Sequence, residues 1–211
     1  MTKRVRKRTK SELESLESEF ERRDRAREKV IRAFLKACNS VSKSRRQTIA
    51  NMANSEWIND FDQIDDDDAF EAESKKWDRL RSKFLRECSD PYELHLFAFG
   101  WNWDDGIDSL QKLVKNKSCD AGTALMVYWY SSPEFYTQYK AINDCPEYNR
   151  DPMKLSRSIE RKLKRGVFAS RLIPFDPTPW VSTEYKDCAV REIPPVMLDP
   201  IEIKTKPRKK K

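Results

Sequence analysis

Two adjacent carboxylates, Asp104 and Asp105, are the side chains of this sequence best suited to chemistry, within the motif Asn102-Trp103-Asp104-Asp105-Gly106. Paired carboxylates can ligate a cation or act as a general acid and base. Neighbouring carboxylates on one backbone usually point apart, however, and the sequence fixes no Ser, Cys or Lys nucleophile beside them. Helix capping by Asp104 is therefore the favoured interpretation, ahead of a binding surface and then of catalysis. We predict no catalytic residue.

The other polar candidates also favour structural roles. His95 lies between two leucines, which is typical of a hydrogen-bonded histidine on a helix face rather than of a catalytic one. Asp120 is expected to cap the helix that begins beside it. The four aspartates at 65–68 lack the alternate spacing and the bend glycine of a calcium loop, so they indicate a linker or a helix start.

The cysteine and glycine counts exclude several classes of site. The five cysteines form no CxxC pair, and the single histidine has no cysteine at metal-ligand spacing, so neither a disulfide framework nor a zinc site is expected. Phosphate-cradling loops need clustered glycines, whereas the four glycines here are scattered. The sequence therefore predicts no metal, no cofactor and no nucleotide-binding α/β fold.

These side chains would be positioned by helices within residues 90–139, the most apolar and aromatic stretch of the chain. Asp90 as N-cap and the proline after it predict a helix that ends at Gly100. Residues 121–130 predict a helix that is apolar nearly all round and therefore central and buried. Shorter helices are predicted at about 105–115 and from Pro133 onward.

The predicted fold class is all-α: a small, bundle-like domain of several helices. A long N-terminal helix begins at Ser11, where Glu14 completes a capping box, and its charged middle is expected to bridge through solvent between two apolar ends. Further helices are predicted at 46–61, 65–88 and 155–165. The predicted regions are a disordered basic arm (1–10), an N-terminal helical region (11–75), a central domain (76–170), a proline-rich extended segment (171–203) and a disordered basic tail (204–211).

Net charge is divided unevenly along the chain. Without the twelve basic residues of the two arms, the 42 Lys and Arg side chains fall to 30, against 35 acidic ones. Basic arms suit salt-dependent, sequence-blind phosphate contacts, although solubilising tails are an equal alternative. The candidate nucleic-acid-binding residues are Lys3, Arg4, Arg6, Lys7, Arg8, Lys10, Arg161, Lys164, Arg165, Arg208, Lys209, Lys210 and Lys211.

The sequence contains neither a signal-peptide pattern nor a run of the roughly 20 apolar residues that a membrane span requires. A reduced, soluble, cytoplasmic protein without a membrane partner is therefore expected. Its oligomeric state is left open.

Aromatic side chains in the central stretch exceed what a small core can hide. Exposed aromatics are common anchors of protein interfaces, and they favour a protein-binding surface. The candidate residues for that surface are Trp101, Trp103, Asp104, Asp105, Tyr128, Tyr130 and Tyr136.

A series of correctly spaced motifs marks residues 80–150: Glu93-Leu94-His95, Asn102-Trp103-Asp104-Asp105-Gly106, Cys119-Asp120, Gly122-Thr123-Ala124-Leu125 and Ser132-Pro133-Glu134-Phe135-Tyr136. Together they resemble a bacterial family known as domain of unknown function 4274. The resemblance implies an all-helical module without an established activity. Some members resemble the small immunity proteins of interbacterial competition, which would make a toxin the partner.

The sequence thus predicts a non-catalytic module that binds a protein partner, with immunity to a toxin as a special case. The alternative is a nucleic-acid-associated protein that uses the basic arms and the helix around 157–165. An enzyme is the third and weakest hypothesis.

Overall fold

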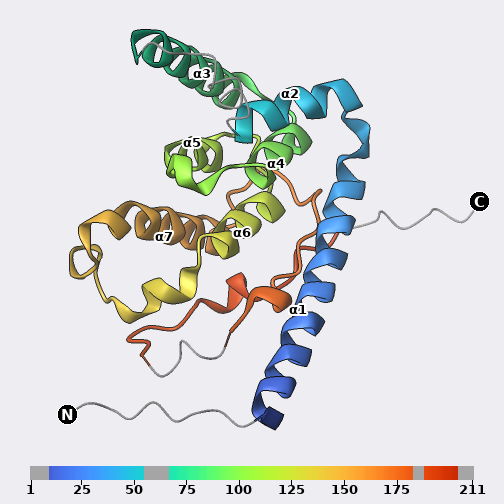
Figure 1. Cartoon of the computed structure of the whole chain (residues 1–211), viewed down its shortest axis with the longest axis vertical. Helices are drawn as coiled ribbons and strands as arrows, with labels where there is room; N and C mark the ends of the chain where they lie inside the picture. The colour runs from blue at the N-terminus through green and yellow to red at the C-terminus, as the bar shows by residue number, and fades with distance from the viewer. Residues whose placement is uncertain (1–9, 55–66, 183–187, 204–211) are drawn as a thin grey trace, which may run out of the picture.

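The chain folds as an assembly of helices, as predicted. The computed structural model describes residues 10–54, 67–182 and 188–203. Within those ranges no strand forms, and two isolated bridges are the only β pairings. The helices are α1 Lys10–Ala37, α2 Lys43–Asn54, α3 Asp67–Glu87, α4 Pro91–Phe99, α5 Asp108–Lys115, α6 Ala121–Tyr130 and α7 Arg150–Lys164 (Figure 1). Residues 1–9 and 204–211 of the predicted arms and residues 65–66 of the aspartate run lie outside those ranges, whereas Asp67 and Asp68 begin α3. The predicted Ser11 capping box depends on side chains that the structure does not describe.

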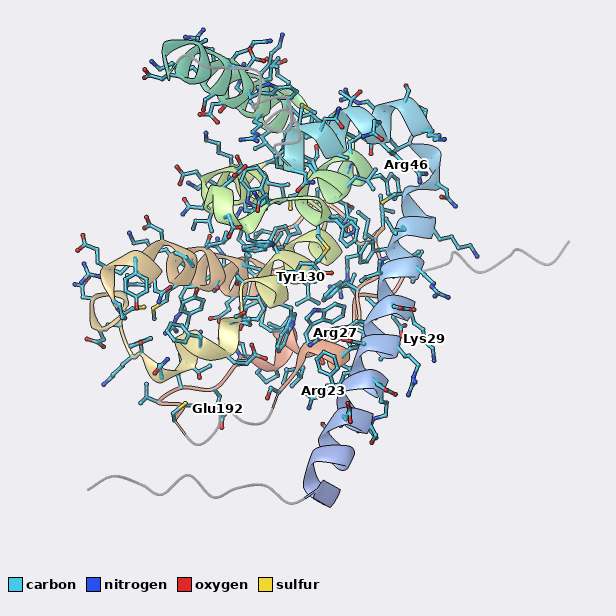
Figure 2. All side chains as sticks on the ribbon, in the orientation of Figure 1. Arg23, Arg27, Lys29, Arg46, Tyr130 and Glu192 are labelled. Carbon is cyan, nitrogen blue, oxygen red and sulfur yellow. The ribbon has the colours of Figure 1, made fainter. Side chains whose placement is uncertain are left out.

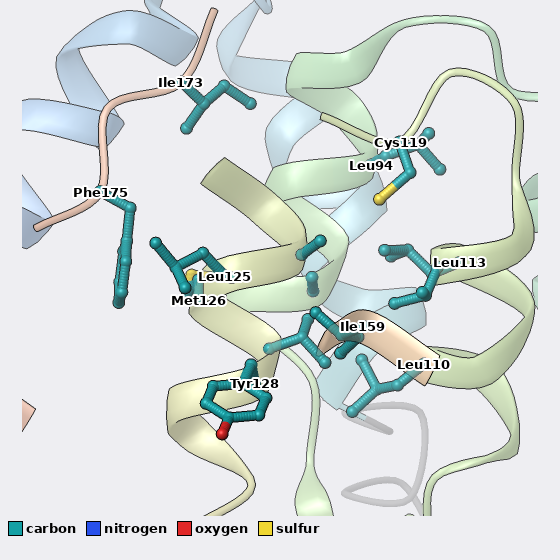
Figure 3. Close-up of a cluster of buried hydrophobic side chains, with 14 of the residues drawn as sticks. Leu94, Leu110, Leu113, Cys119, Leu125, Met126, Tyr128, Ile159, Ile173 and Phe175 are labelled. Carbon is teal, nitrogen blue, oxygen red and sulfur yellow. The ribbon is translucent and has the colours of Figure 1, made fainter. Parts of the chain in front are cut away.

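Helix α6 is the centre of the core, as its uniformly apolar sequence predicts. All of its residues from Ala121 to Trp129 are buried. Figure 3 shows Leu125, Met126 and Tyr128 of this helix among side chains of the neighbouring helices. Complete burial of a large apolar side chain stabilises the fold by roughly 1.5–3 kcal/mol, so this helix supplies a large share of the packing free energy. One hydrophobic cluster contains residues of α6 together with residues from the predicted N-terminal region (11–75), central domain (76–170) and extended segment (171–203).

The C-terminal segment, residues 171–203, belongs to that core. The sequence predicted a proline-rich extended segment here, and the structure shows that Ile173 and Phe175 within it are buried against the central helices (Figure 3). Backbone groups of Phe175 and Ile201 form two hydrogen bonds of 3.0 and 2.9 Å in an isolated antiparallel bridge. The Trp129 indole N–H donates to the Met197 carbonyl oxygen at 2.8 Å. The segment therefore closes one side of α6.

Helix α1 packs along one side of the molecule with its C-terminal half (Figure 1). Of its two apolar ends, the C-terminal one is buried through Val30 and Phe34, whereas Phe20 near the N-terminal one is 63% exposed. The charged middle does not merely bridge through solvent. Arg27 donates to the Pro179 carbonyl oxygen at 3.2 Å and covers the Trp180 ring, while Lys29 points away from the body (Figure 2).

Two short segments differ from their predicted helices. Residues 103–105 form a 3₁₀ turn, and α5 begins only at Asp108. Pro133–Gln138 is also a 3₁₀ helix rather than an α-helix, and two further 3₁₀ turns follow at Ile142–Asp144 and Glu147–Asn149 before α7. These compact connections return the chain to the C-terminal end of α6. The remaining 3₁₀ turns are Cys38–Ser40, Thr178–Trp180 and Pro195–Met197.

Candidate functional site

A groove of about 740 Å³ lies at the C-terminal end of α6, where the starts of α5 and α7 meet the turn after α6. Its lining contains no Lys or Arg. Asp105, Asp108 and Asp151 supply its carboxylates. Its aromatic side chains are Trp103, Tyr130, Phe135, Tyr136 and Tyr148. We refer to this site as the aromatic-acidic groove.

Local backbone geometry builds the walls of the groove. Ser132 adopts a left-handed conformation with φ of 54°, which ends α6 and turns the chain into the 3₁₀ helix that carries Phe135 and Tyr136. Positive φ is uncommon for a residue other than glycine and often marks functional sites. Gly106, with φ of 76°, ends the opposite turn, and its carbonyl accepts the Trp101 indole N–H at 2.8 Å.

Two of the carboxylates are present because helices begin at the groove. Asp108 and Asp151 occupy the first turns of α5 and α7, where negative side chains interact favourably with the helix dipole. Asp151 also pairs with Lys154 at 2.7 Å. Asp108 has no ion-pair or hydrogen-bond partner among the described residues. The groove therefore offers at least one carboxylate that internal contacts do not neutralise.

Asp105 is held from behind by a buried arginine. The Arg81 guanidinium lies 3.4 Å from the Asp105 carboxylate and 5.3 Å from the centre of the Trp101 ring. Arg81 also donates to the Met52 carbonyl oxygen at 2.7 Å. These contacts join α2, α3 and the 103–105 turn on this side of the groove.

Two tyrosines of the groove, Tyr130 and Tyr136, are neutral hydrogen-bonding groups. Burial raises the pKa of Tyr130 to about 12, and burial followed by the nearby Cys145 raises the pKa of Tyr136 to about 12. Both phenols therefore remain protonated across the physiological pH range. Tyr148 is 81% exposed at the rim and Phe135 is also exposed, so both rings are available for contact.

The structure brings together four of the seven predicted protein-binding residues. Trp103, Asp105, Tyr130 and Tyr136 line the groove, although Tyr136 is mostly buried. Asp104 is exposed and lies outside the lining. The predicted capping of α5 by Asp104 is wrong, because α5 begins at Asp108 without a side-chain cap. Asn102 instead caps the preceding 103–105 turn, where its side chain accepts the Asp104 backbone N–H at 3.2 Å.

Trp101 and Tyr128 are buried and therefore do not belong to the candidate protein-binding surface. Their exposed fractions are 5% and 0%. Buried Trp and Tyr side chains need a partner for the polar tip, and both have one within the chain. The Trp101 indole is satisfied by Gly106, and the Tyr128 hydroxyl donates to Glu160 at 3.0 Å.

Sequence reasoning missed Asp108, Phe135, Tyr148 and Asp151 as site residues. Tyr148 carried one usable signal, an aromatic residue inside a polar connection. Asp151 carried none, because an acidic residue in a first helical turn is an ordinary stabilising feature.

The opposite end of α6 contains polar residues with purely structural contacts. Asp120 caps the helix as predicted and accepts three hydrogen bonds: from Gly122 N–H at 2.8 Å, Ser170 Oγ at 2.6 Å and Leu172 N–H at 2.7 Å. A Cβ atom on Gly122 would lie 2.0 Å from the Ile173 carbonyl oxygen, so this position requires glycine.

His95 is a packed, hydrogen-bonded histidine, as predicted. Its ring is completely buried, lies 3.0 Å from the Thr123 hydroxyl through Nδ1, and packs edge-on against Phe34. Burial lowers the pKa of His95 to about 3. The ring therefore remains neutral at physiological pH and has no access to a ligand in solution.

Of the candidate nucleic-acid-binding residues, the structure describes the side chains of Arg161, Lys164 and Arg165. All three are exposed near the end of α7. The others, in the two arms, lie outside the described side chains. Within the described part of the chain, no three His, Cys, Asp or Glu residues are placed to hold a metal ion. No described helix is both long enough and apolar enough to cross a membrane.

Comparison with known proteins identifies a domain rather than an activity. No curated protein and no solved structure matches the chain. The family resemblance predicted for residues 80–150 is confirmed by a match to a family model over residues 89–164. That range contains α4 to α7 and every residue that lines the aromatic-acidic groove. Residues 89–164 are therefore a domain of the family described as Domain of unknown function (DUF4274).

Proposed function

We propose that this protein is a non-catalytic binding module whose aromatic-acidic groove takes up a basic segment of a partner protein. The observation that carries the proposal is the composition of the groove, in which aromatic rings and carboxylates converge without a lysine or arginine. Both groups attract the same class of side chain. Cations stack on aromatic faces, and guanidinium groups form forked hydrogen bonds with carboxylates.

Three arginines of the described chain, Arg27, Arg45 and Arg81, already show this mode of recognition. Arg81 covers the ring of Trp101 while its guanidinium reaches the carboxylate of Asp105. Arg27 covers the ring of Trp180 at 5.7 Å. An arginine of a partner entering the groove would meet the same pairing, with Tyr148 or Phe135 as the ring and Asp108 as the carboxylate. Arginine is favoured over lysine because its flat, weakly hydrated group suits stacking.

Dimensions support a peptide segment as the occupant. A volume of about 740 Å³ accommodates a few side chains rather than a whole folded surface. Exposed rings at the rim and buried ones beneath them resemble the anchoring pattern of protein interfaces, where a few aromatic residues carry most of the binding free energy.

The direct test measures binding of a fluorescent, arginine-rich peptide by anisotropy. Tyr148→Ala and Asp108→Asn should each weaken binding about tenfold, or about 1.4 kcal/mol. Phe20→Ala and Asp199→Asn are matched controls, since they remove an exposed aromatic ring and an exposed carboxylate outside the groove. Raising the salt concentration should weaken binding. Absence of binding, or equal losses in the control variants, contradicts the proposal.

A toxin neutralised by the module is the special case that the family resemblance implies. In that case a basic segment of the toxin would occupy the groove. Tyr148→Ala should then abolish protection of cells that express the toxin without lowering the amount of folded module. A variant that protects as well as the unaltered protein rejects this form of the proposal.

A second candidate, nucleic-acid association, is favoured by the exposure of Arg161, Lys164 and Arg165 on one helix. Its test is a gel-shift series at rising salt with the intact chain and with a chain lacking residues 1–10 and 204–211. Phosphate contacts predict a shift that salt weakens and that the deletion removes. The absence of a salt-dependent shift with the intact chain excludes this candidate.

A further inference from the structure

A second cavity is lined mainly by basic residues, in contrast to the aromatic-acidic groove. It has a volume of about 420 Å³ and lies between the turn at 140–142 and the outer face of α7. Four basic residues line it: Lys140, Lys154, Arg157 and Arg161. Glu160 is the one acidic residue in the lining. None of these five residues lines the aromatic-acidic groove.

Glu160 does not neutralise the basic residues of this cavity, because its charge is taken up elsewhere. Arg191, from the C-terminal segment, binds both oxygens of the Glu160 carboxylate at 2.7 and 3.2 Å. The Tyr128 hydroxyl donates a third hydrogen bond to it at 3.0 Å. The carboxylate is only 8% exposed. An anion in the cavity would therefore meet Glu160 as part of a neutral pair.

Arg157 is held in place at the cavity by the protein backbone. Its Nη2 donates to the carbonyl oxygens of Tyr139 at 3.2 Å and Lys140 at 3.5 Å. Its Nε is buried and has no hydrogen-bond partner among the described residues. Burial, followed by repulsion from Arg191, lowers the pKa of Arg157. Its positive charge is therefore only partly compensated by the protein.

Two acidic side chains close in sequence to the lining residues are engaged by other groups. Asp151 pairs with Lys154 at 2.7 Å, and the Asp144 carboxylate accepts the Ala141 backbone N–H at 2.8 Å. Lys140 and Arg161 are exposed and form no ion pair with a described residue. A fixed guanidinium at the wall with two adaptable cations at the rim is an arrangement that suits a multiply charged anion.

We propose that this cavity binds the phosphate group of a small phosphomonoester, with Arg157, Lys140 and Arg161 as its ligands. A phosphomonoester carries close to two negative charges and three acceptor oxygens at neutral pH, which matches three converging basic side chains better than a carboxylate does. The volume holds the phosphate and a small organic group attached to it. The cavity shares no lining residue with the proposed peptide-binding groove.

The experiment is calorimetric titration of the full-length protein with inorganic phosphate at constant ionic strength, with chloride as the reference anion. Saturable, one-to-one binding is expected. Lys140→Ala and Arg161→Ala should each weaken it about tenfold, the loss of a charge-assisted contact. Arg157→Lys keeps the charge but loses the planar fork, and it should weaken binding as well.

Lys164→Ala and Arg165→Ala are the matched controls, because they remove exposed cations from the same helix outside the cavity. They should leave the dissociation constant within about twofold of the original value, since screened surface charges interact weakly over distance. Free AMP and free O-phosphoserine then identify the organic group that improves affinity over phosphate alone.

Two results overturn the proposal. One is the absence of saturable phosphate binding in the unaltered protein. The other is an equal loss of binding in the control and cavity variants, which would indicate diffuse attraction to a basic helix. A thermal melt of each variant without phosphate separates lost binding from lost folding. Lys140→Ala is the decisive variant, because its exposed side chain has no described packing role.

Discussion

The two ends of helix α6 place similar residue types in opposite situations. At the N-terminal end, Asp120 has three donors within the chain and Gly122 lies against the C-terminal segment. At the C-terminal end, Tyr130 and the residues after it open into a groove that contains Asp108, a carboxylate without a partner among the described residues. The polar groups at the N-terminal end are therefore engaged by contacts within the chain. At the C-terminal end, aromatic rings and a carboxylate remain available for a ligand.

The comparison teaches that a polar motif in a buried helix is best assessed by counting its internal partners. Asp120 and His95 belong to motifs that suggest chemistry, yet their partners are within the core. The exposed residues that remain available for a ligand, such as Tyr148, lie on connections that no strong motif marks. Substitutions at the N-terminal end should therefore affect folding, and substitutions at the C-terminal end should affect binding.

Asp120→Ala should produce the largest loss of stability. It removes three charge-assisted hydrogen bonds and leaves buried backbone N–H groups unpaired, at a cost of about 4 kcal/mol. Urea denaturation measures the free energy of unfolding. Asp90→Ala is the matched control, since Asp90 caps α4 through one bond at 2.8 Å and should cost about 1 kcal/mol. Equal losses of stability in the two variants would show that Asp120 contributes no more than an ordinary helix cap.

Gly122→Ala should follow, with a loss of about 3 kcal/mol. The added methyl group would meet backbone atoms of Ile173, which cannot move without disturbing the C-terminal segment. Gly100→Ala is the control, because a Cβ there meets its nearest atoms at an ordinary 3.5 Å. Thermal unfolding of the two variants should show a clear drop only for Gly122→Ala. A tolerated methyl group at position 122 would contradict the described contact.

His95 should make stability depend on pH in a defined window. Unfolded histidine binds a proton near pH 6.5, while burial keeps the folded ring neutral down to about pH 3, so acid favours the unfolded state. Stability should fall by about 2 kcal/mol between pH 6.5 and pH 5. In His95→Gln this loss should disappear, because the chain then has no histidine. A persistent loss of the same size would assign it to other groups.

Tyr148→Ala and Asp108→Asn should have the smallest effects on folding. Both side chains are exposed at the groove, so the free energy of unfolding should change by no more than about 0.5 kcal/mol. Denaturation measured beside peptide binding checks the contrast between the two ends. A large loss of stability in either variant would show that the groove residues are structural, as Asp120 is.

Local signals explain what could be predicted from the sequence. The helices that start after Asp90 and Asp120 have the predicted bounds, because a capping carboxylate and an apolar run fix them within a few residues. The start of α5 was displaced from about residue 105 to Asp108, because Asn102 stabilises a separate turn first. Asn102 and Asp104 are equally good caps by composition, and tertiary contacts decide between them.

The groove and the cavity could not be predicted, because both depend on long-range placement. Tyr148 and Asp151 meet Trp103 only after Ser132 reverses the chain with a positive φ that no sequence pattern announces. Burial of the C-terminal segment was missed for a related reason. Its apolar residues, such as Ile173 and Met197, are separated by prolines and follow no helical or strand period.

The C-terminal segment also sets when the fold can be completed during synthesis. Residues 89–164 leave the ribosome before residues 171–203, with the side of α6 that faces Ile173 and Phe175 still uncovered. The Trp129 indole finds its acceptor only when Met197 has emerged, and the Phe175 bridge closes only with Ile201. A nascent chain therefore carries its most apolar helix partly uncovered until Ile201 has been synthesised, and a chain truncated before Ile173 never covers it.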